Sequence, residues 1–348
     1  MLFRSVVAIP KTTIYSIFLK KSLKFNGLFD ELRPILLNII KDPKRSNEAV
    51  KDNDLRRRQV SPARVGALLL SFLFCVTAPM VLLANPKYAA MVMDARSGEI
   101  LHSENANKRL HPASLTKMMT LYVVFQAVEN GEISLDKKVK ISRHAASEPP
   151  SKLGLRPGQK VRLRYLIRAA AVKSANDAAT ALGEAIEGSE AAFAQRMNRT
   201  AKAMGMNRTT FKNAHGLTES GHLSTARDMT ILGRHLFYDF PDYYHLFARK
   251  TASAGSKKVR NTNRRFLSNY RGADGIKTGY TRAAGYNLVA SANRNGERII
   301  TTVFGGRSTT TRNAQVAKLM NLGFKKAPRN VKLQKPKPPS YKIGRAHV

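Results

Sequence analysis

A short segment with a serine and a lysine one helical turn apart is the feature that most restricts how this chain can fold. The segment runs from Pro112 to Thr120, and Ser114 and Lys117 are followed by apolar residues that recur with helical period. Residues three apart on a helix share one face, with about 4.5 Å of rise between them, so the Lys117 amine can reach the Ser114 hydroxyl. The segment therefore predicts a packed helix, running from about Ser114 to Asn130, with a polar pair at its start.

The chemistry of this pair is that of a nucleophile beside its own base. A neutral lysine can accept the serine proton. The positive end of the helix dipole disfavours a second cation, and burial would desolvate the amine, so both effects favour the neutral form. The spacing alone is weak evidence, because Ser134 and Lys137 repeat it, but there Asp136 would keep the lysine protonated. We therefore assign the nucleophile to Ser114 and the base to Lys117.

Two further polar motifs follow in the chain. Ser174-Ala-Asn176 begins 60 residues after Ser114, between a helical pattern over 162–172 and a second helix expected from Asp177. Its side chains could merely cap that second helix, or they could face the first helix across a cleft.

The third motif, Lys277-Thr-Gly279, begins 103 residues after Ser174 in a segment rich in β-branched residues, which is typical of a strand. Gly279 would let the backbone of a substrate approach the strand. Lys277 could hold a terminal carboxylate, and Thr278 could add a hydroxyl.

Taken in this order, the three motifs resemble those of penicillin-binding proteins and serine β-lactamases. The residues around them narrow the resemblance to the low-molecular-mass D-alanyl-D-alanine carboxypeptidases, and it extends from about Tyr88 to Phe324. The supporting segments are Ser114–Thr120, Ser174–Ala178, Asn213–Leu217, Ser224–Asp228 and Asp274–Thr281. The chain departs from the usual pattern at Ala175, where these carboxypeptidases commonly have glycine.

The resemblance implies an α+β fold of the DD-peptidase and β-lactamase type. Such a fold has an antiparallel five-stranded sheet flanked by helices, and an all-helical cluster forms the other wall of the active-site cleft. The residue patterns agree, because they predict a hairpin over 88–102, three successive strands between 275 and 304, and a closing helix over 311–324.

The resemblance also implies roles for individual residues. Ser114 would attack the carbonyl between the two D-alanines of a peptidoglycan stem peptide, and Lys117 would accept its proton. Ser174 and Asn176 would relay that proton to the departing D-alanine and position the peptide. β-Lactams would acylate the same serine.

Substrate binding would fall to the third motif and the residue after it. By the same resemblance, the oxyanion would lie between the backbone N–H groups of Ser114 and Tyr280. The expected substrate-binding residues are Lys277, Thr278, Gly279 and Tyr280. No cofactor and no metal are expected, and none of the eight histidines has His-x-x-x-His spacing.

Two alternative functions remain open at this point. A class A-like β-lactamase needs a glutamate in a Glu-x-x-Leu-Asn loop, and this pentapeptide does not occur in the sequence. Glu219 is the nearest loop carboxylate, in an unlike setting, so we expect slow release of bound penicillin. A non-catalytic, basic cell-wall-binding protein would instead tolerate Ser114→Ala. The sequence does not decide between hydrolysis and transpeptidation.

The charge of the chain is strongly positive. Lys and Arg number 60 and Asp and Glu 23, which gives a net charge of +37. An excess of this size favours an anionic membrane or wall surface as a partner. The basic residues are scattered and form no nucleic-acid motif, so no specific nucleic acid is expected.

Composition divides the chain into four parts. Residues 1–64 read as a basic extension and n-region outside the mature fold, and residues 65–84 as a signal peptide or a retained membrane anchor. Residues 85–326 form the expected catalytic domain, and residues 327–348 a Pro- and Lys-rich tail that we expect to be disordered. The protein should be exported to the periplasm, with the inner membrane as a site of attachment if the anchor is kept. The single cysteine, Cys75, excludes an internal disulfide.

Overall fold

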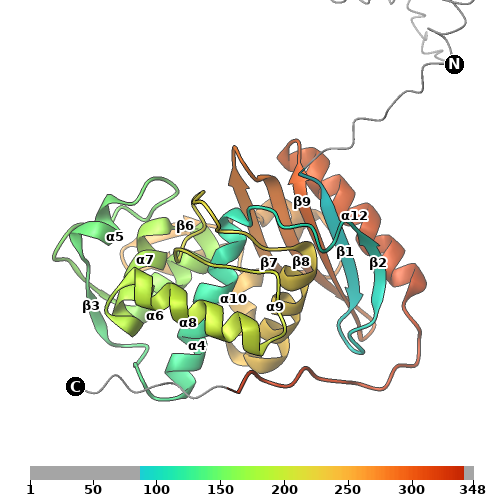
Figure 1. Cartoon of the computed structure of the whole chain (residues 1–348), viewed down its shortest axis with the longest axis horizontal. Coiled ribbons are helices and arrows are strands. Elements are labelled where there is room, and N and C mark those ends of the chain that lie inside the picture. Colours follow the sequence, from blue (N-terminus) through green and yellow to red (C-terminus); the bar gives the residue numbers. More distant parts are fainter. Residues whose placement is uncertain (1–86, 341–348) are drawn as a thin grey trace, which may run out of the picture. The chain divides into compact units, whose positions relative to one another are not determined.

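The computed structural model describes residues 87–340, so the expected basic extension and the signal peptide or anchor lie outside the described residues. The described part is an α+β fold with a five-stranded antiparallel sheet beside a cluster of helices (Figure 1). This confirms the fold class that the motifs predicted. Between residues 87 and 340, no helix is both long enough and apolar enough to cross a bilayer.

The sheet joins two strands from the start of the described chain to three strands from near its end. Its strand order is β2-β1-β9-β8-β7, with every neighbouring pair antiparallel. The turn between β8 and β9 is Asn295-Gly296, and both residues have positive φ, as a tight two-residue hairpin requires. The strands are β1 (Ala89–Asp94), β2 (Ile100–Glu104), β7 (Ala273–Thr281), β8 (Gly285–Arg294) and β9 (Glu297–Gly306).

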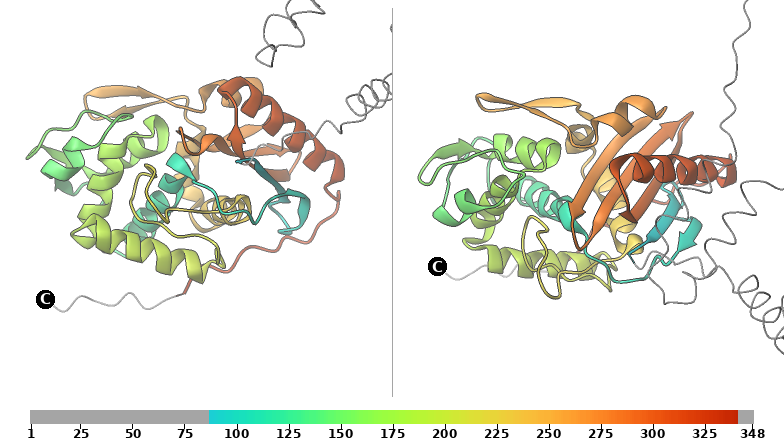
Figure 2. Two further views of the ribbon diagram at one scale, coloured as in Figure 1. Left: turned by 45° about the horizontal axis from the view of Figure 1, so that its top comes forward. Right: turned by 90° about the horizontal axis from the view of Figure 1, so that it is seen from above.

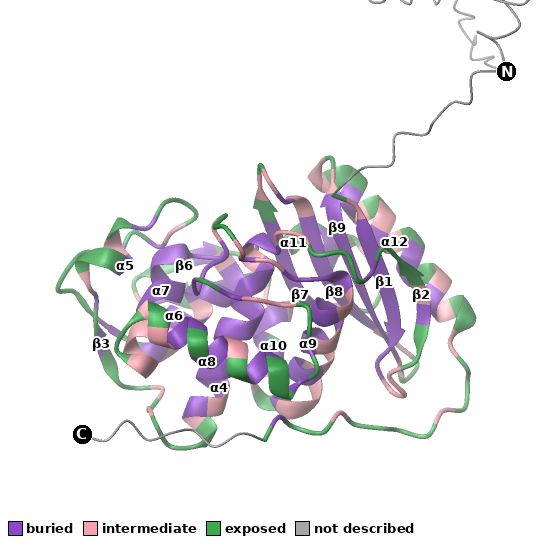
Figure 3. Cartoon of the chain, in the orientation of Figure 1, coloured by how far each residue is buried: buried purple, intermediate pink, exposed green. Residues whose placement is uncertain are grey.

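Both faces of the sheet are covered, so its central strands are buried along most of their length (Figure 3). Helix α12 (Thr309–Lys326) packs Val316 and Met320 on one face. On the other face, α9 (Ala226–Asp239) and α10 (Pro241–Ala248) join the larger apolar core. The approach of α9 is close, since a Cβ at Gly233 would lie 3.0 Å from Ile276 Cδ1.

The helical cluster is built around α4 (Lys117–Glu129), whose residues are buried nearly all round (Figures 2 and 3). The predicted helix over 114–130 is confirmed, except that its first turn, Ala113–Thr116, is a 3₁₀ helix. Ala113 has φ of +50°, outside the α-helical range, and the regular helix begins at Lys117.

The remaining elements complete the cluster and its rim. A π-helical turn, Ala169–Lys173, extends α6 up to the second motif. The helices are α5 (Arg143–Ser147), α6 (Leu163–Arg168), α7 (Asn176–Glu187), α8 (Glu190–Ala203) and α11 (Arg264–Asn269), and the small hairpins are β3 (Lys138–Lys140) with β4 (Lys160–Arg162) and β5 (Thr251–Ala254) with β6 (Lys257–Arg260).

Residues 328–340 follow α12 as chain without helix or strand (Figure 1). The Arg96 guanidinium donates to the carbonyls of Pro328 and Arg329, at 2.7 and 3.3 Å, and the Gln334 N–H donates to the Arg96 carbonyl at 2.8 Å. Arg234 also donates to the Gln334 carbonyl. These contacts hold the first part of the Pro- and Lys-rich segment against the body of the domain.

Candidate active site

Ser114 and Lys117 lie as their spacing predicts, with Lys117 Nζ 3.0 Å from Ser114 Oγ. The lysine is fully buried at the start of α4, whereas Ser114 is partly exposed. Lys117 Nζ also lies 2.7 Å from Asn176 Oδ1 and 2.7 Å from the backbone oxygen of His215. The amine therefore has three oxygen neighbours, from three separate segments of the chain.

The surroundings of Lys117 favour the neutral amine. Burial, and after it the nearby Lys277, hold the pKa of Lys117 well below its ordinary 10.5, and Glu148 and Asp177 offset only part of this. A neutral amine has two N–H groups and one lone pair. Because the oxygens of Asn176 and His215 can only accept, the two N–H groups point to them. The lone pair is then left for the Ser114 hydroxyl, which is the arrangement a general base needs.

The second motif is placed by a change of backbone direction. Ser174 adopts the left-handed conformation, with φ of +64°, at the end of the π-helical turn, and α7 begins at Asn176. The Asn176 amide nitrogen donates to the Pro149 carbonyl at 2.8 Å, which leaves its oxygen facing Lys117. Asn176 thus faces the start of α4, and no side chain of the motif caps α7.

The next residue, Asp177, fixes the loop over the second motif. Its carboxylate is fully buried and accepts hydrogen bonds from the backbone N–H groups of Leu153, Gly154 and Leu155, at 2.8 to 3.0 Å. The loop over 149–155 includes Pro149, whose carbonyl orients Asn176.

The third motif lies on the edge strand β7, opposite the second. Lys277 is buried, and its Nζ donates to Ser174 Oγ at 2.7 Å and to the Thr278 carbonyl at 3.0 Å. Burial, followed by the charge of Arg312, lowers the pKa of Lys277 to about 7. Thr278 Oγ1 donates to Thr262 Oγ1 at 2.7 Å.

Gly279 brings the strand against the nucleophile. A Cβ at this position would lie 2.8 Å from the Pro112 oxygen and 3.1 Å from the Ser114 nitrogen, so only glycine fits without displacement. Asn287 of β8 holds the same turn, because its amide donates to the carbonyls of His111 and Pro112 at 3.0 and 3.2 Å.

The three motifs thus converge on one cleft with a volume of about 350 Å³. Lys117 and Lys277 lie behind its wall, each in contact with a serine hydroxyl that lines the cleft. No aspartate or glutamate among residues 87–340 lines it. The lining residues are Ser114, Pro150, Ser151, Ser174, Asn176, Gly216, Leu217, Thr262, Thr278, Gly279, Tyr280, Thr281, Tyr286, Thr309 and Arg312.

Sequence reasoning missed Arg312, the second cation of the cleft. It is buried on α12, where its guanidinium donates to the Asn287 carbonyl at 3.3 Å and to Asn313 Oδ1 at 2.7 Å. Burial lowers its pKa to about 10. In the sequence it is one more arginine in an amphipathic helix, and no spacing to another motif marks it.

The loop over 213–219 closes the cleft on one side. Its Gly216 has φ of +86°, and a Cβ there would lie 1.9 Å from the Ala113 oxygen, so the loop sits directly on the nucleophile turn. At the rim, Thr218 Oγ1 donates to Thr281 Oγ1 at 3.1 Å, which links the loop to β7. A larger cavity of about 600 Å³ shares Leu217 with the cleft but contains no residue of the three motifs, so the smaller cleft is the candidate active site.

Comparison with known proteins places this site in a family. The family model described as D-alanyl-D-alanine carboxypeptidase, peptidase S11, matches residues 82–308. The chain is 38% identical to D-alanyl-D-alanine carboxypeptidase DacF of Bacillus subtilis over 283 residues, which cover 77% of this chain and 71% of DacF. It is 40% identical to DacC of Escherichia coli over 243 residues, covering 68% of this chain and 61% of DacC, which is less than two thirds of that relative.

Two solved structures show the same arrangement of elements. Penicillin binding protein 5 from Haemophilus influenzae superposes with a TM-score of 0.65 at 37% identity, covering 68% of this chain and 70% of that one. Penicillin-Binding Protein D2 from Listeria monocytogenes, in its cefotaxime-bound form, superposes with a TM-score of 0.62 at 36% identity, covering 68% of this chain and 96% of that one.

Proposed function

This chain belongs to the D-alanyl-D-alanine carboxypeptidase family, and on that premise we propose that it removes the terminal D-alanine from peptidoglycan stem peptides through an acyl-enzyme on Ser114. The observation that carries the proposal is the setting of Lys117. Its amine is buried, has its N–H groups directed to two oxygens, and faces the Ser114 hydroxyl at 3.0 Å.

The first step is attack by Ser114. As Ser114 Oγ bonds to the carbonyl carbon between the two D-alanines, its proton passes to the Lys117 amine. The carbonyl oxygen gains negative charge, and the backbone N–H groups of Ser114 and Tyr280 stabilise it. The close approach of Gly279 to the Ser114 nitrogen supports this position for the oxyanion. Loss of one such donor typically slows a reaction ~100-fold to ~1000-fold.

The second step expels the terminal D-alanine. Its nitrogen needs a proton, and the Ser174 hydroxyl relays the one that Lys117 took from Ser114, which leaves Ser174 protonated and Lys117 neutral again. The hydrogen bond from Lys277 holds the Ser174 oxygen in place for this relay. Asn176 keeps the Lys117 amine in place and is oriented to position the peptide. Water then attacks the acyl-enzyme, with Lys117 again as the base, and releases the shortened peptide.

The free carboxylate of the substrate explains the cations of the cleft. Thr278 and Arg312 line the cleft, and Lys277 lies behind it. Burial makes the positive charges of Lys277 and Arg312 unfavourable. A bound carboxylate would offset this cost, because it supplies a counter-ion. Peptides that end in a free D-alanine carboxylate are therefore the substrates that this site fits best.

β-Lactams should acylate the same serine and leave slowly. The described cleft has no acidic residue in its lining that could activate a deacylating water, in contrast to what a class A-like β-lactamase requires. We accordingly propose that penicillin forms a long-lived adduct on Ser114. The sequence features of residues 65–84 and the net charge of +37 support action in the periplasm, next to an anionic membrane or wall surface.

The test compares Ser114→Ala with Ser134→Ala, which alters the exposed serine of the other Ser-x-x-Lys pair. Two quantities are measured: labelling by fluorescent penicillin, and release of D-alanine from a pentapeptide that ends in D-Ala-D-Ala. We expect Ser114→Ala to lose both and Ser134→Ala to keep both. Peptide mapping by mass spectrometry should place the penicilloyl group on Ser114.

The alternatives give different results. Unchanged D-alanine release by Ser114→Ala would defeat the assignment of the nucleophile. Rapid turnover of penicillin would favour the β-lactamase, and a wild-type protein with neither labelling nor release would favour the non-catalytic wall-binding protein.

A further inference from the structure

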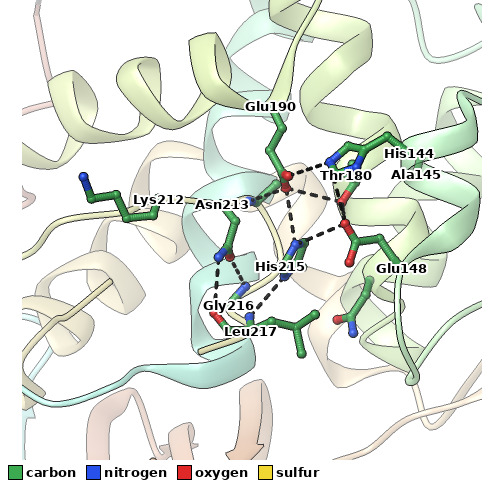
Figure 4. A network of polar contacts seen from close by, with 12 residues as sticks. His144, Ala145, Glu148, Thr180, Glu190, Lys212, Asn213, His215, Gly216 and Leu217 are labelled. Atoms are coloured by element: carbon green, nitrogen blue, oxygen red, sulfur yellow. Dashed lines mark hydrogen bonds and ion pairs between the residues drawn. The ribbon is translucent and has the colours of Figure 1, made fainter. Parts of the chain in front are cut away.

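A group of histidine and glutamate side chains lies in the larger cavity, outside the cleft (Figure 4). His144, Glu148 and Glu190 each offer a ligand atom, and these atoms lie within 4.8 Å of one another. His144 lies in α5, Glu148 directly follows that helix, and Glu190 is the first residue of α8. We call these three residues the His–Glu–Glu cluster. The proposed acyl transfer uses none of them.

The distances within the cluster fit a bound metal ion. His144 Nε2 lies 3.0 Å from Glu190 Oε2 and 3.9 Å from Glu148 Oε1. Two ligand atoms at 2.0 to 2.1 Å from one tetrahedral ion are roughly 3.3 Å apart, which falls between these two values. Binding an ion would lengthen the first distance by roughly 0.3 Å and shorten the second by roughly 0.6 Å.

The two carboxylates are already oriented by neighbours that would form an outer shell around an ion. Thr180 Oγ1 lies 3.0 Å from Glu148 Oε1, and the Ala214 N–H donates to Glu190 Oε1 at 2.9 Å. His215 Nε2 lies between the two glutamates, 3.3 Å from Glu148 and 3.5 Å from Glu190 (Figure 4). Outer contacts of this kind fix the geometry of metal-binding carboxylates.

The burial of the two glutamates and the charge of the cavity around them both favour binding of a cation. The Glu148 and Glu190 side chains are 6% and 14% exposed, whereas His144 is 58% exposed, so the cluster has a desolvated base and an open side. Glu184 and Glu219 also line the cavity, with Lys212 as its only lysine or arginine among the described residues. In a chain with a net charge of +37, a cavity of this composition is a local site for a cation.

We propose that the His–Glu–Glu cluster binds a divalent transition-metal ion of the zinc class through His144 Nε2, Glu148 and Glu190, with water in the fourth position. An imidazole with two carboxylates suits zinc and its neighbours, whereas magnesium and calcium prefer sites made of oxygen alone. His215 acts as a positioning residue that holds both carboxylates. The ion would link α5 to the start of α8.

The experiment titrates the untagged full chain with Zn²⁺ by calorimetry and with Co²⁺ by visible absorption. We expect one saturable Zn²⁺ site per chain, a tetrahedral Co²⁺ spectrum, and no displacement by excess Mg²⁺ or Ca²⁺. His144→Ala and Glu190→Gln should each weaken Zn²⁺ binding at least tenfold, because each removes one of only three protein ligands. Zn²⁺ should also raise the Tm of the wild type and not that of His144→Ala.

The matched control is His102→Ala. His102 Nε2 lies 3.9 Å from Glu104 Oε2, which makes a histidine–glutamate pair without a third ligand residue in the described part of the chain, and its loss should leave Zn²⁺ binding unchanged. Labelling by penicillin checks that each variant is folded. The proposal is overturned if the wild type shows no saturable Zn²⁺ binding, or if folded His144→Ala binds as tightly as the wild type.

Discussion

Lys277 Nζ donates a 2.7 Å hydrogen bond to Ser174 Oγ, so the cation proposed to bind the substrate carboxylate is joined to the hydroxyl proposed to protonate the leaving group. The pKa of this lysine is lowered to about 7, mainly by burial. Its charge state in the free protein therefore changes within the range of pH in which the reaction would be measured.

We expect a bell-shaped pH dependence of kcat/KM for D-alanine release. Lys117 must be neutral to act as a base, so the rate rises with pH through the pKa of Lys117, which lies well below 10.5. Lys277 must be protonated to bind a carboxylate, so the rate falls as pH passes about 7. In Lys277→Arg the guanidinium stays charged, and the alkaline limb should disappear from the neutral range. An unchanged alkaline limb in that variant would assign the limb to another group.

A side chain at Gly216 should disturb the nucleophile turn. Its Cβ would lie 1.9 Å from the Ala113 oxygen, and the residue has φ of +86°. Gly216→Ala should therefore lower the free energy of unfolding by more than about 3 kcal/mol and slow penicillin acylation at least tenfold.

The matched variant is Gly221→Ala in the same region. Gly221 also has positive φ, +78°, but its Cβ would meet only Lys212 Cε, at an ordinary 3.5 Å. It should lose about 1–2 kcal/mol from the backbone alone and keep its acylation rate. Equal losses in both variants, measured by urea unfolding, would show that the contact with Ala113 is unimportant.

Asp177 should contribute strongly to stability. Its buried carboxylate accepts from three backbone N–H groups of the loop over 149–155 and from the Ala178 N–H. Asp177→Ala leaves these donors buried without an acceptor, so we expect a loss of about 3 kcal/mol or more in urea unfolding. The exposed Asp242 is the control, and Asp242→Ala should change stability by less than about 0.5 kcal/mol. A small effect at Asp177 would mean that water replaces the carboxylate.

Stability should fall in acid through His222. Burial lowers the pKa of this histidine to about 3, and it bridges Thr116 Oγ1 and the Lys212 N–H at 2.8 and 3.1 Å. Below about pH 6.5 the unfolded chain binds a proton there and the folded chain does not, so stability is lost as pH falls, by about 1.4 kcal/mol per unit until about pH 3.

His222→Gln should flatten that dependence, because an amide can bridge the same two groups without titrating. The exposed His245 gives the control, and His245→Gln should keep the wild-type slope between pH 6.5 and pH 4. If all three proteins show one slope, the acid sensitivity comes from other groups.

The parts of the fold and site that the sequence predicted are those marked by a local pattern of residue types or spacing. The strands near 275–304 follow from their β-branched residues and the closing helix from its apolar period. The approach of Lys117 to Ser114 follows from their spacing, although the pair is divided between a 3₁₀ turn and α4. The convergence of the three motifs was expected from the resemblance, because no periodicity relates Ser114 to Lys277.

The parts that sequence reasoning missed depend on contacts without a residue signature. The His215 group that accepts from Lys117 is a backbone carbonyl, which any residue could supply. The 3₁₀ turn at Ser114 begins at Ala113, whose positive φ is an uncommon conformation for alanine. In the His–Glu–Glu cluster, His144 and Glu148 are four residues apart, but a histidine and a glutamate at this spacing are common on helices, and Glu190 comes from another helix.

The hydroxyl contact between Thr218 and Thr281 joins the loop over 213–219 to β7 at the rim of the cleft, so the opening of the cleft depends on it. It is a neutral, solvent-exposed bridge, and such a bond contributes only about 1 kcal/mol. We therefore expect a bulky group on a bound substrate or inhibitor to break this bond at little more than thermal energy. The hydrogen bonds of Lys117, Asn176 and Lys277 are buried beneath this rim, so we expect them to stay intact when it opens. We therefore expect the rim of the cleft to adapt to different bound molecules, while the hydrogen bonds beneath it keep their geometry.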